Sequence, residues 1–319
     1  MSSYLPELTV RLAKGISRLP AEVRERHTDY LLQAQRSDGG FCGRAGGASD
    51  LYYTSFGLRG LSVLGALYGE PAERAARFLK QQLESRQTIV DFFSLFYAAQ
   101  LLFLSSGIDV FAEARSDWPD RVARMLSELR RGDGGFAKAA EGHAGSTYHT
   151  FLTLLVFELL RRDVPEPDRV LDFLMQQRDP DGGWREIRAS KRAGTNPTAA
   201  AIACHRMLGE LDDLFANQTI DFLLNMQTTE GGLRANTRIP IADLLSSFTG
   251  GLTLQDLGAW RELDLPAFRT FVERLQLPSG GFRAAVWDDS HDVEYTFYGL
   301  GCLALLNQPE GDSPSGSIG

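Results

Sequence analysis

A Gly-Gly pair, followed at once by an aromatic residue or a leucine, recurs along the chain at nearly constant spacing. The pairs are Gly39-Gly40, Gly134-Gly135, Gly182-Gly183, Gly231-Gly232 and Gly280-Gly281. Their first glycines are separated by 95, 48, 49 and 49 residues. Because 95 is nearly twice 48, we expect one further copy near residue 87 that has lost its glycines. Six units of about 48 residues are typical of stacked two-helix repeats.

Each unit contains two segments with different hydrophobic patterns. Segments that precede the glycine pairs, such as 118–130 and 165–177, carry their charges along one side. Segments that follow the pairs are apolar nearly all round, as in 149–160, 197–208 and 295–306. Amphipathic helices belong on an outer face and fully apolar helices in a buried layer. An open array of repeats needs polar residues on its terminal units, where the ends face water. The last inner segment, 295–306, is as apolar as the internal ones, which favours a closed ring. The sequence therefore predicts an all-α fold, an α6–α6 barrel of six inner and six outer helices.

Two columns of residues mark the beginnings of the inner helices. A hydroxyl recurs at Thr54, Ser94, Thr150, Thr198, Ser247 and Thr296. Four positions earlier stand Asp50, Val90, Ser146, Gly194, Asp243 and Asp292. Asp, Ser and Gly are favoured N-cap residues, so this column predicts the helix start in five of the six units. We also expect the first glycine of each pair to end the preceding helix in the left-handed conformation, and the second to allow close packing.

Composition excludes several classes of function. The net charge of −8 argues against a nucleic-acid or anionic-membrane surface. Cys42, Cys204 and Cys302 are too few and too scattered for a disulfide framework or a thiolate zinc site. We find no signal segment and no apolar run of membrane-spanning length, which predicts a cytoplasmic protein that is not an integral membrane protein. One domain is expected over residues 1–307, with a disordered Gly/Pro/Ser-rich tail at 308–319.

The Gln-rich helix, the Gly-Gly-aromatic turn and the Asp-x-x-Tyr-Thr helix start of residues 50–54 resemble the repeat of prenyltransferases and squalene cyclases. The resemblance covers roughly residues 30–306, and in length the chain is similar to the β subunits of protein farnesyl- and geranylgeranyltransferases. It implies an α6–α6 barrel and a transferase that acts on an isoprenoid diphosphate, either farnesyl or geranylgeranyl. It also implies a partner similar to the helical-repeat α subunit.

The same resemblance implies a zinc site that is degenerate in this chain. The family's zinc is held by an Asp, a Cys and a His, which match Asp243, Leu245 and Tyr295. Without the other two ligands, the usual activation of a thiol nucleophile is lost. His291 and Asp292, in a neighbouring acidic loop, are further candidates for binding zinc or magnesium. Asp243 and Asp292 are the candidate catalytic residues, although a role as helix caps explains both.

The ligand is expected at the mouth of the barrel and in its centre. Four basic residues of the mouth loops can give charge-assisted hydrogen bonds to a diphosphate, or be solvated surface: Arg188, Lys191, Arg192 and Arg238. Residues at or near the starts of the inner helices can line an apolar funnel for the isoprenoid chain, or fill the core: Tyr53, Phe93, Tyr97, Tyr148, His149, Tyr295 and Tyr298.

Three functions remain open at this point. The first is a prenyltransferase-like enzyme, and the second is a class II terpene cyclase, which protonates an alkene with an Asp-x-Asp-Asp motif. The two Asp-Asp pairs, Asp212-Asp213 and Asp288-Asp289, have Glu210 and Val286 in place of the leading Asp, which favours the first. The third is a non-catalytic lipid-binding or scaffold subunit, which the missing zinc ligands keep open.

Overall fold

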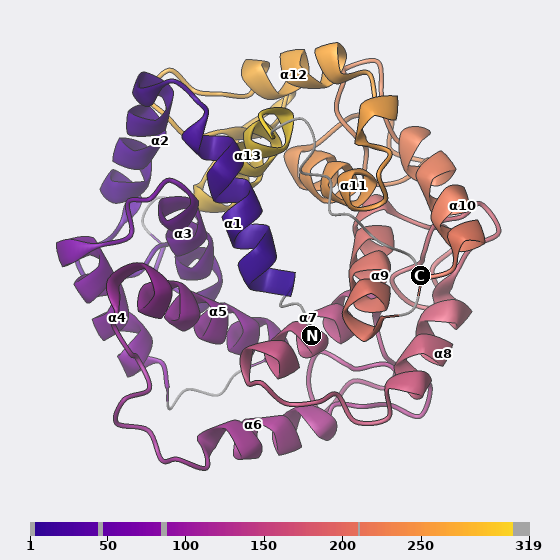
Figure 1. Ribbon diagram of the computed structural model, residues 1–319, viewed down its shortest axis with the longest axis horizontal. Coiled ribbons are helices and arrows are strands. Elements are labelled where there is room, and N and C mark those ends of the chain that lie inside the picture. Colours follow the sequence, from indigo (N-terminus) through magenta and orange to yellow (C-terminus); the bar gives the residue numbers. More distant parts are fainter. Residues whose placement is uncertain (1–3, 44–46, 84–87, 210, 309–319) are drawn as a thin grey trace.

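The helices form two concentric rings in the computed structural model, which describes residues 4–43, 47–83, 88–209 and 211–308 (Figure 1). The inner ring consists of α3 (Leu51–Val63), α5 (Ile89–Ser106), α7 (Thr147–Leu159), α9 (Thr195–Leu208), α11 (Leu244–Asp256) and α13 (Val293–Leu306). The outer ring consists of α2 (Ala21–Ala34), α4 (Gly69–Gln81), α6 (Trp118–Ser127), α8 (Pro167–Gln177), α10 (Asp213–Leu224) and α12 (Leu265–Arg274). A 3-10 turn, η1 (Trp260–Glu262), and a short hairpin of β1 (Arg283–Ala285) and β2 (Asp288–His291) complete the units.

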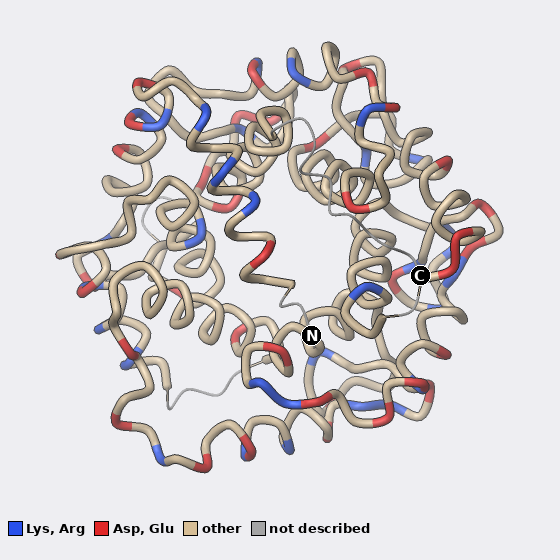
Figure 2. Tube along the Cα trace, viewed as in Figure 1, with Lys and Arg blue, Asp and Glu red and all other residues tan. Residues whose placement is uncertain are grey.

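The ring is closed. Each inner helix packs against the next one along the chain, and α13 packs against α3. The expected α6–α6 barrel is therefore confirmed. Charged residues lie mainly on the outer helices and loops, as the colours in Figure 2 show, and the inner helices carry few. Burial inside the ring accounts for the apolar pattern of the inner segments.

An additional helix, α1 (Tyr4–Ser17), crosses one end of the ring (Figure 1). The backbone N–H groups of Tyr4 and Leu5 each donate to the carboxylate of Glu158 at 3.0 Å. Arg11 pairs with Asp256 at 2.5 Å. Glu158 and Asp256 lie at the C-terminal ends of α7 and α11, so α1 covers the end of the barrel opposite the glycine turns.

The first glycine of each pair has the expected left-handed backbone, with a φ of 94° at Gly182, but it does not end a helix. Helix α8 already ends at Gln177. The position needs glycine because a Cβ on Gly182 would lie 2.2 Å from the carbonyl oxygen of Gln218 on α10. Our expectation of a helix C-cap was therefore wrong, and the constraint is contact with the next unit.

The second glycine of each pair rests against an aromatic ring of the next outer helix, as Gly183 does against Phe222. In the last unit the neighbour is the first outer helix. A Cβ on Gly280 would lie 2.3 Å from the carbonyl oxygen of Arg26, and Gly281 packs on Tyr30. The last glycine turn thus closes the ring on α2. The turn expected near residue 87 falls at 84–87, outside the described residues, as does most of the predicted disordered tail.

The N-cap column is confirmed where it was predicted. Asp50, Ser146, Asp243 and Asp292 accept hydrogen bonds from the first turns of their helices, and Gly194 caps α9 without a side chain. Helix α5 is the exception, as expected from its Val90. It begins instead with a capping box, in which Thr88 is the N-cap and Asp91 is the third residue of the helix.

The hydroxyl column has a different role from marking the helix start. The N–H that follows a glycine pair donates to the hydroxyl of the same unit, as from Trp184 to Thr198 at 2.9 Å. Units one, three and five repeat the bond at Thr54, Thr150 and Ser247. In the sixth unit the Thr296 hydroxyl donates to the carbonyl of Asp292 at 2.7 Å instead. Four buried hydroxyls therefore tie the glycine turns to the inner helices.

One inner helix corrects the expectation that no apolar run is long enough to span a membrane. By length and composition α5, at 18 residues, reaches that limit. More than half of it is buried inside the ring, and its last turns leave Phe103 and Leu104 exposed. Its apolar character is explained by its place among the inner helices.

We predict that Gly182→Ala destabilises the protein by at least about 2 kcal/mol more than Gly209→Ala. Both glycines have positive φ, but a Cβ on Gly209 would meet nothing within 4 Å. The control therefore measures backbone strain alone, and the difference measures contact with α10. Urea unfolding of both variants checks this, and equal losses would contradict the account.

We also predict that ring closure weakens in acid through His27. Its Nδ1 accepts a hydrogen bond from the Gly281 N–H at 3.0 Å, and its ring stacks on Phe282. Burial lowers the pKa of His27 to about 4, so the folded state holds it neutral. The stabilisation that neutral His27 gives is complete above pH 6.5 and is lost as the pH falls towards 4. The loss in the free energy of unfolding reaches about 3 kcal/mol.

The measurement is urea unfolding at pH 7 and pH 5 for the natural chain and for His27→Phe, which keeps an aromatic ring at this position. The variant is expected to be less stable at pH 7 and less sensitive to pH. An equal pH dependence in both proteins would show that His27 does not carry the effect.

Candidate functional site

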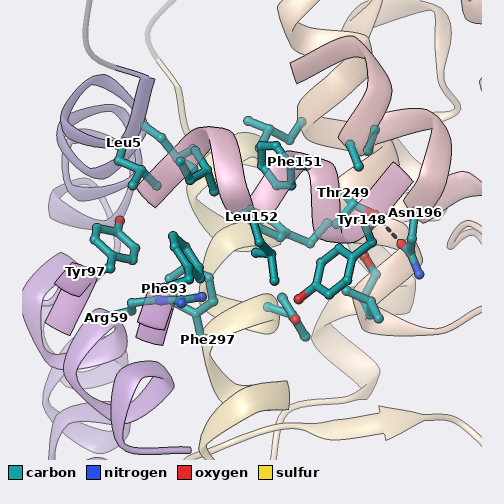
Figure 3. Close-up of a pocket in the computed structure, with 18 of the residues that line it drawn as sticks. Leu5, Arg59, Phe93, Tyr97, Tyr148, Phe151, Leu152, Asn196, Thr249 and Phe297 are labelled. Carbon is teal, nitrogen blue, oxygen red and sulfur yellow. Dashed lines mark hydrogen bonds between the residues drawn. The ribbon is translucent and has the colours of Figure 1, made fainter. Parts of the chain in front are cut away.

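The inner helices and α1 enclose a cavity of about 390 Å³ at the centre of the ring (Figure 3). All six inner helices contribute to its wall, and Tyr4, Leu5 and Leu8 of α1 line it as well. Because α1 lies at the C-terminal ends of the inner helices, it forms the floor, and the glycine turns surround the mouth. The volume falls in the range of small-molecule sites.

The cavity wall follows helical spacing on each inner helix. On α5 it takes Val90, Phe93 and Tyr97, and on α11 it takes Leu245, Phe248 and Leu252. Residues three or four apart share one face of a helix, so each helix presents a single stripe to the centre. Positions outside the stripe fill the space between the rings.

The two sides of the cavity differ in chemistry. Aromatic rings line α3, α5, α7 and α13, and Phe56 of α3 packs against Tyr298 of α13 with ring centroids 5.3 Å apart. On α9, across the ring, the wall is formed by Asn196 and small alanines. The Thr249 hydroxyl of α11 donates to the Asn196 side chain at 2.6 Å (Figure 3). The open space therefore lies beside an aromatic wall.

Charged side chains are rare in this wall. Arg59 of α3 lines the cavity and is only 8% exposed. Glu186, from the loop between α8 and α9, also lines it, and burial raises the pKa of its carboxyl. Glu294 accepts hydrogen bonds from the hydroxyls of Tyr52 at 2.7 Å and Tyr298 at 3.3 Å. Burial raises the pKa of Glu294 as well.

The structure brings together some of the aromatic residues chosen from the sequence. Phe93, Tyr97, Tyr148 and Tyr298 line the cavity. Tyr53, His149 and Tyr295 are not part of its wall. Tyr53 packs over Gly43, and His149 forms a hydrogen bond with the Ser146 hydroxyl at 2.7 Å, while burial lowers its pKa. Burial raises the pKa of Tyr295 to about 12.

Sequence reasoning missed Arg59 and the second ring of aromatic residues, Phe56, Phe151, Phe248 and Phe297. A signal for them exists. Counting three, four or seven positions onward from the helix starts reaches Phe56 and Arg59 from Tyr52, and Phe151 from Tyr148. These residues lie one or two turns beyond the helix starts, and the columns of recurring residues do not extend that far.

The four basic residues predicted to bind a diphosphate, Arg188, Lys191, Arg192 and Arg238, are exposed on the mouth loops and do not line the cavity. Arg192 donates from Nη1 to the Thr237 hydroxyl at 3.3 Å. This contact joins the loop that precedes α9 to the loop that carries Arg238. The structure therefore brings two of the four residues to adjoining loops.

The residues do not fit the zinc that the resemblance implies. Both carboxylate oxygens of Asp243 accept hydrogen bonds from Ser246, and Asp292 accepts from the N–H groups of Glu294 and Tyr295. His291 is exposed on β2, and Leu245 lines the cavity. Within the described ranges, no three His, Cys, Asp or Glu side chains are grouped to hold a metal ion.

Comparison with known proteins identifies a family with this architecture. The model of the prenyltransferase alpha-alpha toroid domain matches residues 16–70, 72–239 and 238–315. Farnesyltransferase β subunits of Schizosaccharomyces pombe and Pisum sativum are 25% and 26% identical over 148 and 198 residues. These matches cover 45% and 60% of this chain, and the chain spans only 38% and 46% of those proteins.

Solved structures share the whole ring. Candida albicans protein geranylgeranyltransferase-I, complexed with GGPP, superposes with a TM-score of 0.70 at 15% identity, over 89% of this chain and 91% of that chain. The type II terpene cyclase MstE from Scytonema, in a complex with geranylgeranyl dihydroxybenzoate, gives 0.62 at 14% identity, over 95% and 98%. At these identities the likeness shows the fold alone.

The family model covers nearly the whole described chain, and the closed double ring has the architecture that the model names. The chain therefore belongs to the prenyltransferase alpha-alpha toroid family.

Proposed function

We propose that this protein binds an isoprenoid diphosphate and transfers its isoprenyl group to an acceptor. The observation that carries the proposal is the central cavity, which is closed by α1 at one end and walled mainly by apolar and aromatic side chains. A branched hydrocarbon chain gains free energy by leaving water for such a wall. Two proteins of similar fold are named with geranylgeranyl ligands, which supports an isoprenoid as the ligand of the cavity.

The diphosphate is proposed to lie at the mouth. All six inner helices begin there, and the positive ends of their dipoles favour an anion. Aspartates cap α3, α11 and α13, whereas α9 begins at Gly194 without a side-chain cap. The loop before α9 carries Arg188, Lys191 and Arg192, and the adjoining loop carries Arg238. Positive charge is thus concentrated around one uncapped helix start.

The acceptor is not activated by zinc in this proposal, because the residues at the family's metal positions do not fit the ion. The positioning of two reactants in one closed cavity remains available as a source of rate. Because the two relatives are named as β subunits, the proposal includes a separate partner chain. If the protein binds the lipid without transferring it, the proposed transferase activity is wrong and the protein is a carrier.

Cyclisation is the second candidate, and two half-buried carboxyl groups favour it. Glu186 lines the cavity, and Glu294 is hydrogen-bonded to Tyr52 and Tyr298 of its wall. Burial raises the pKa of both carboxyls, which favours a role as proton donor to an alkene. The two Asp-Asp pairs are not placed to donate this proton, since Asp212 caps α10 and Asp289 is exposed on β2. Since neither Asp-Asp pair has the leading Asp of the cyclase motif, we rank transfer first.

Binding is tested by native mass spectrometry with geranylgeranyl diphosphate. We expect one lipid per natural chain and at least about tenfold weaker binding for Ala199→Trp, since Ala199 lines the cavity and an indole fills it. The matched control is Asn217→Trp on the exposed face of α10, which is expected to bind normally. If Ala199→Trp binds as well as the natural chain, the lipid does not occupy the cavity.

A further inference from the structure

Arg59 is a charged side chain in a cavity wall that is mostly apolar and aromatic. It lies in the third turn of α3, beyond Tyr52 and Phe56 as the helix runs from the mouth towards α1. Figure 3 shows it beside Phe93 and Phe297 in the cavity wall. With 8% of its surface exposed, it has little contact with solvent. A guanidinium stays charged at any physiological pH, so its charge is held within the cavity.

Aromatic rings surround the guanidinium. The distance from its central carbon to the ring centroid is 4.5 Å for Phe56, 4.9 Å for both Phe93 and Tyr97, and 5.8 Å for Phe297. Rings attract a cation through their faces. They do not accept the in-plane N–H bonds that a guanidinium directs at oxygen atoms. The stacking therefore holds Arg59 in place without satisfying its donors.

No acceptor for these donors is found in the part of the chain that the structure describes. The buried Nε of Arg59 has no hydrogen-bond partner there, and none of the ion pairs found there involves Arg59. The nearby Glu294 accepts from Tyr52 and Tyr298 instead. Glu186 accepts from the Tyr148 N–H at 3.4 Å. Burial raises the pKa of both carboxyls, the charge of Arg59 lowers that of Glu294, and neither carboxyl forms an ion pair with Arg59 among those of the described residues.

An uncompensated cation in a low-dielectric site is costly, and an anion placed against it recovers much of that cost. The anion that suits a guanidinium is a planar or tetrahedral group of oxygens that accepts two parallel N–H bonds. The apolar wall around Arg59 requires the rest of the ligand to be hydrocarbon. These two requirements together describe a hydrophobic acid.

We propose that Arg59 binds an oxyanion inside the cavity, so that the ligand of this site is a hydrophobic chain bearing a carboxylate or phosphate group. The inference rests on the proposed function only in taking the cavity as the ligand site. It adds an anion-binding residue in the wall, separate from the exposed loops at the mouth. Two sources have this chemistry: the diphosphate of the isoprenoid itself, inserted head first, and a separate organic acid that acts as acceptor.

The test compares three probes that share one C20 chain: geranylgeraniol, geranylgeranoic acid and geranylgeranyl diphosphate. Affinities are measured by calorimetry for the natural protein and for the variants Arg59→Met, Arg238→Met and Arg77→Met. Methionine keeps an unbranched side chain against the rings and removes the charge. Arg238→Met removes an exposed charge of the proposed diphosphate site at the mouth. The matched control is Arg77→Met, which removes an exposed charge on the outer helix α4, away from the cavity and the mouth.

The natural protein is expected to bind geranylgeranoic acid at least about tenfold more tightly than the alcohol, as a charge-assisted hydrogen bond requires. Arg59→Met is expected to lose this preference and keep its affinity for the alcohol, whereas the control Arg77→Met keeps both. If Arg59→Met also weakens the diphosphate, the isoprenoid head is the source of the oxyanion. If only Arg238→Met weakens the diphosphate, the oxyanion belongs to a separate acid.

Equal affinity of the natural protein for acid and alcohol would overturn the inference, and this comparison does not depend on how the variants fold. Binding of alcohol and diphosphate would then still support the proposed function. An acid preference that survives in Arg59→Met would overturn the inference too. If the natural protein binds none of the three probes, the proposed function fails together with the inference.

Discussion

The close contact between each glycine turn and the next outer helix is the constraint on which the ring depends. At the described first glycines a Cβ would lie 2.1 to 2.3 Å from a backbone carbonyl oxygen of the following unit. Such an approach is open only to glycine, and the positive φ of these residues imposes the same choice. The contact recurs in the five units that carry the glycine pair, and at Gly280 it reaches Arg26 on α2. This last contact joins the sixth unit to the first and closes the barrel.

Closure creates the site as well as the fold. Six fully apolar helices cannot face water, and their mutual packing leaves a central space that side chains fill only in part. Helix α1 covers one end of this space with polar contacts to Glu158 and Asp256. The result is a cavity with one mouth, one floor and an aromatic wall. Within it, the charge of Arg59 is the feature least expected in an apolar core.

The fold was largely predictable because the glycine spacing and the two helix patterns each reflect a single physical requirement. The N-caps at Asp50, Ser146, Asp243 and Asp292 were predictable for the same reason. The roles of the glycines and of the hydroxyls were not, since both depend on contacts with segments elsewhere in the sequence. The carbonyl of Gln218 that excludes a Cβ at Gly182 belongs to a later unit, and no local pattern points to it.

The candidate site was predicted only in part. Aromatic residues near the helix starts were recognised, and Phe93, Tyr97, Tyr148 and Tyr298 do line the cavity. Arg59 was overlooked because an isolated arginine in an apolar helix carries no signature until the ring surrounds it.

Photo-crosslinking with a benzophenone-bearing isoprenoid diphosphate tests most directly the central claim that the isoprenoid binds in the cavity of the ring. The account predicts labelled peptides from α5, α7, α9 and α11, protected by unlabelled geranylgeranyl diphosphate. Labels confined to the outer helices would contradict it.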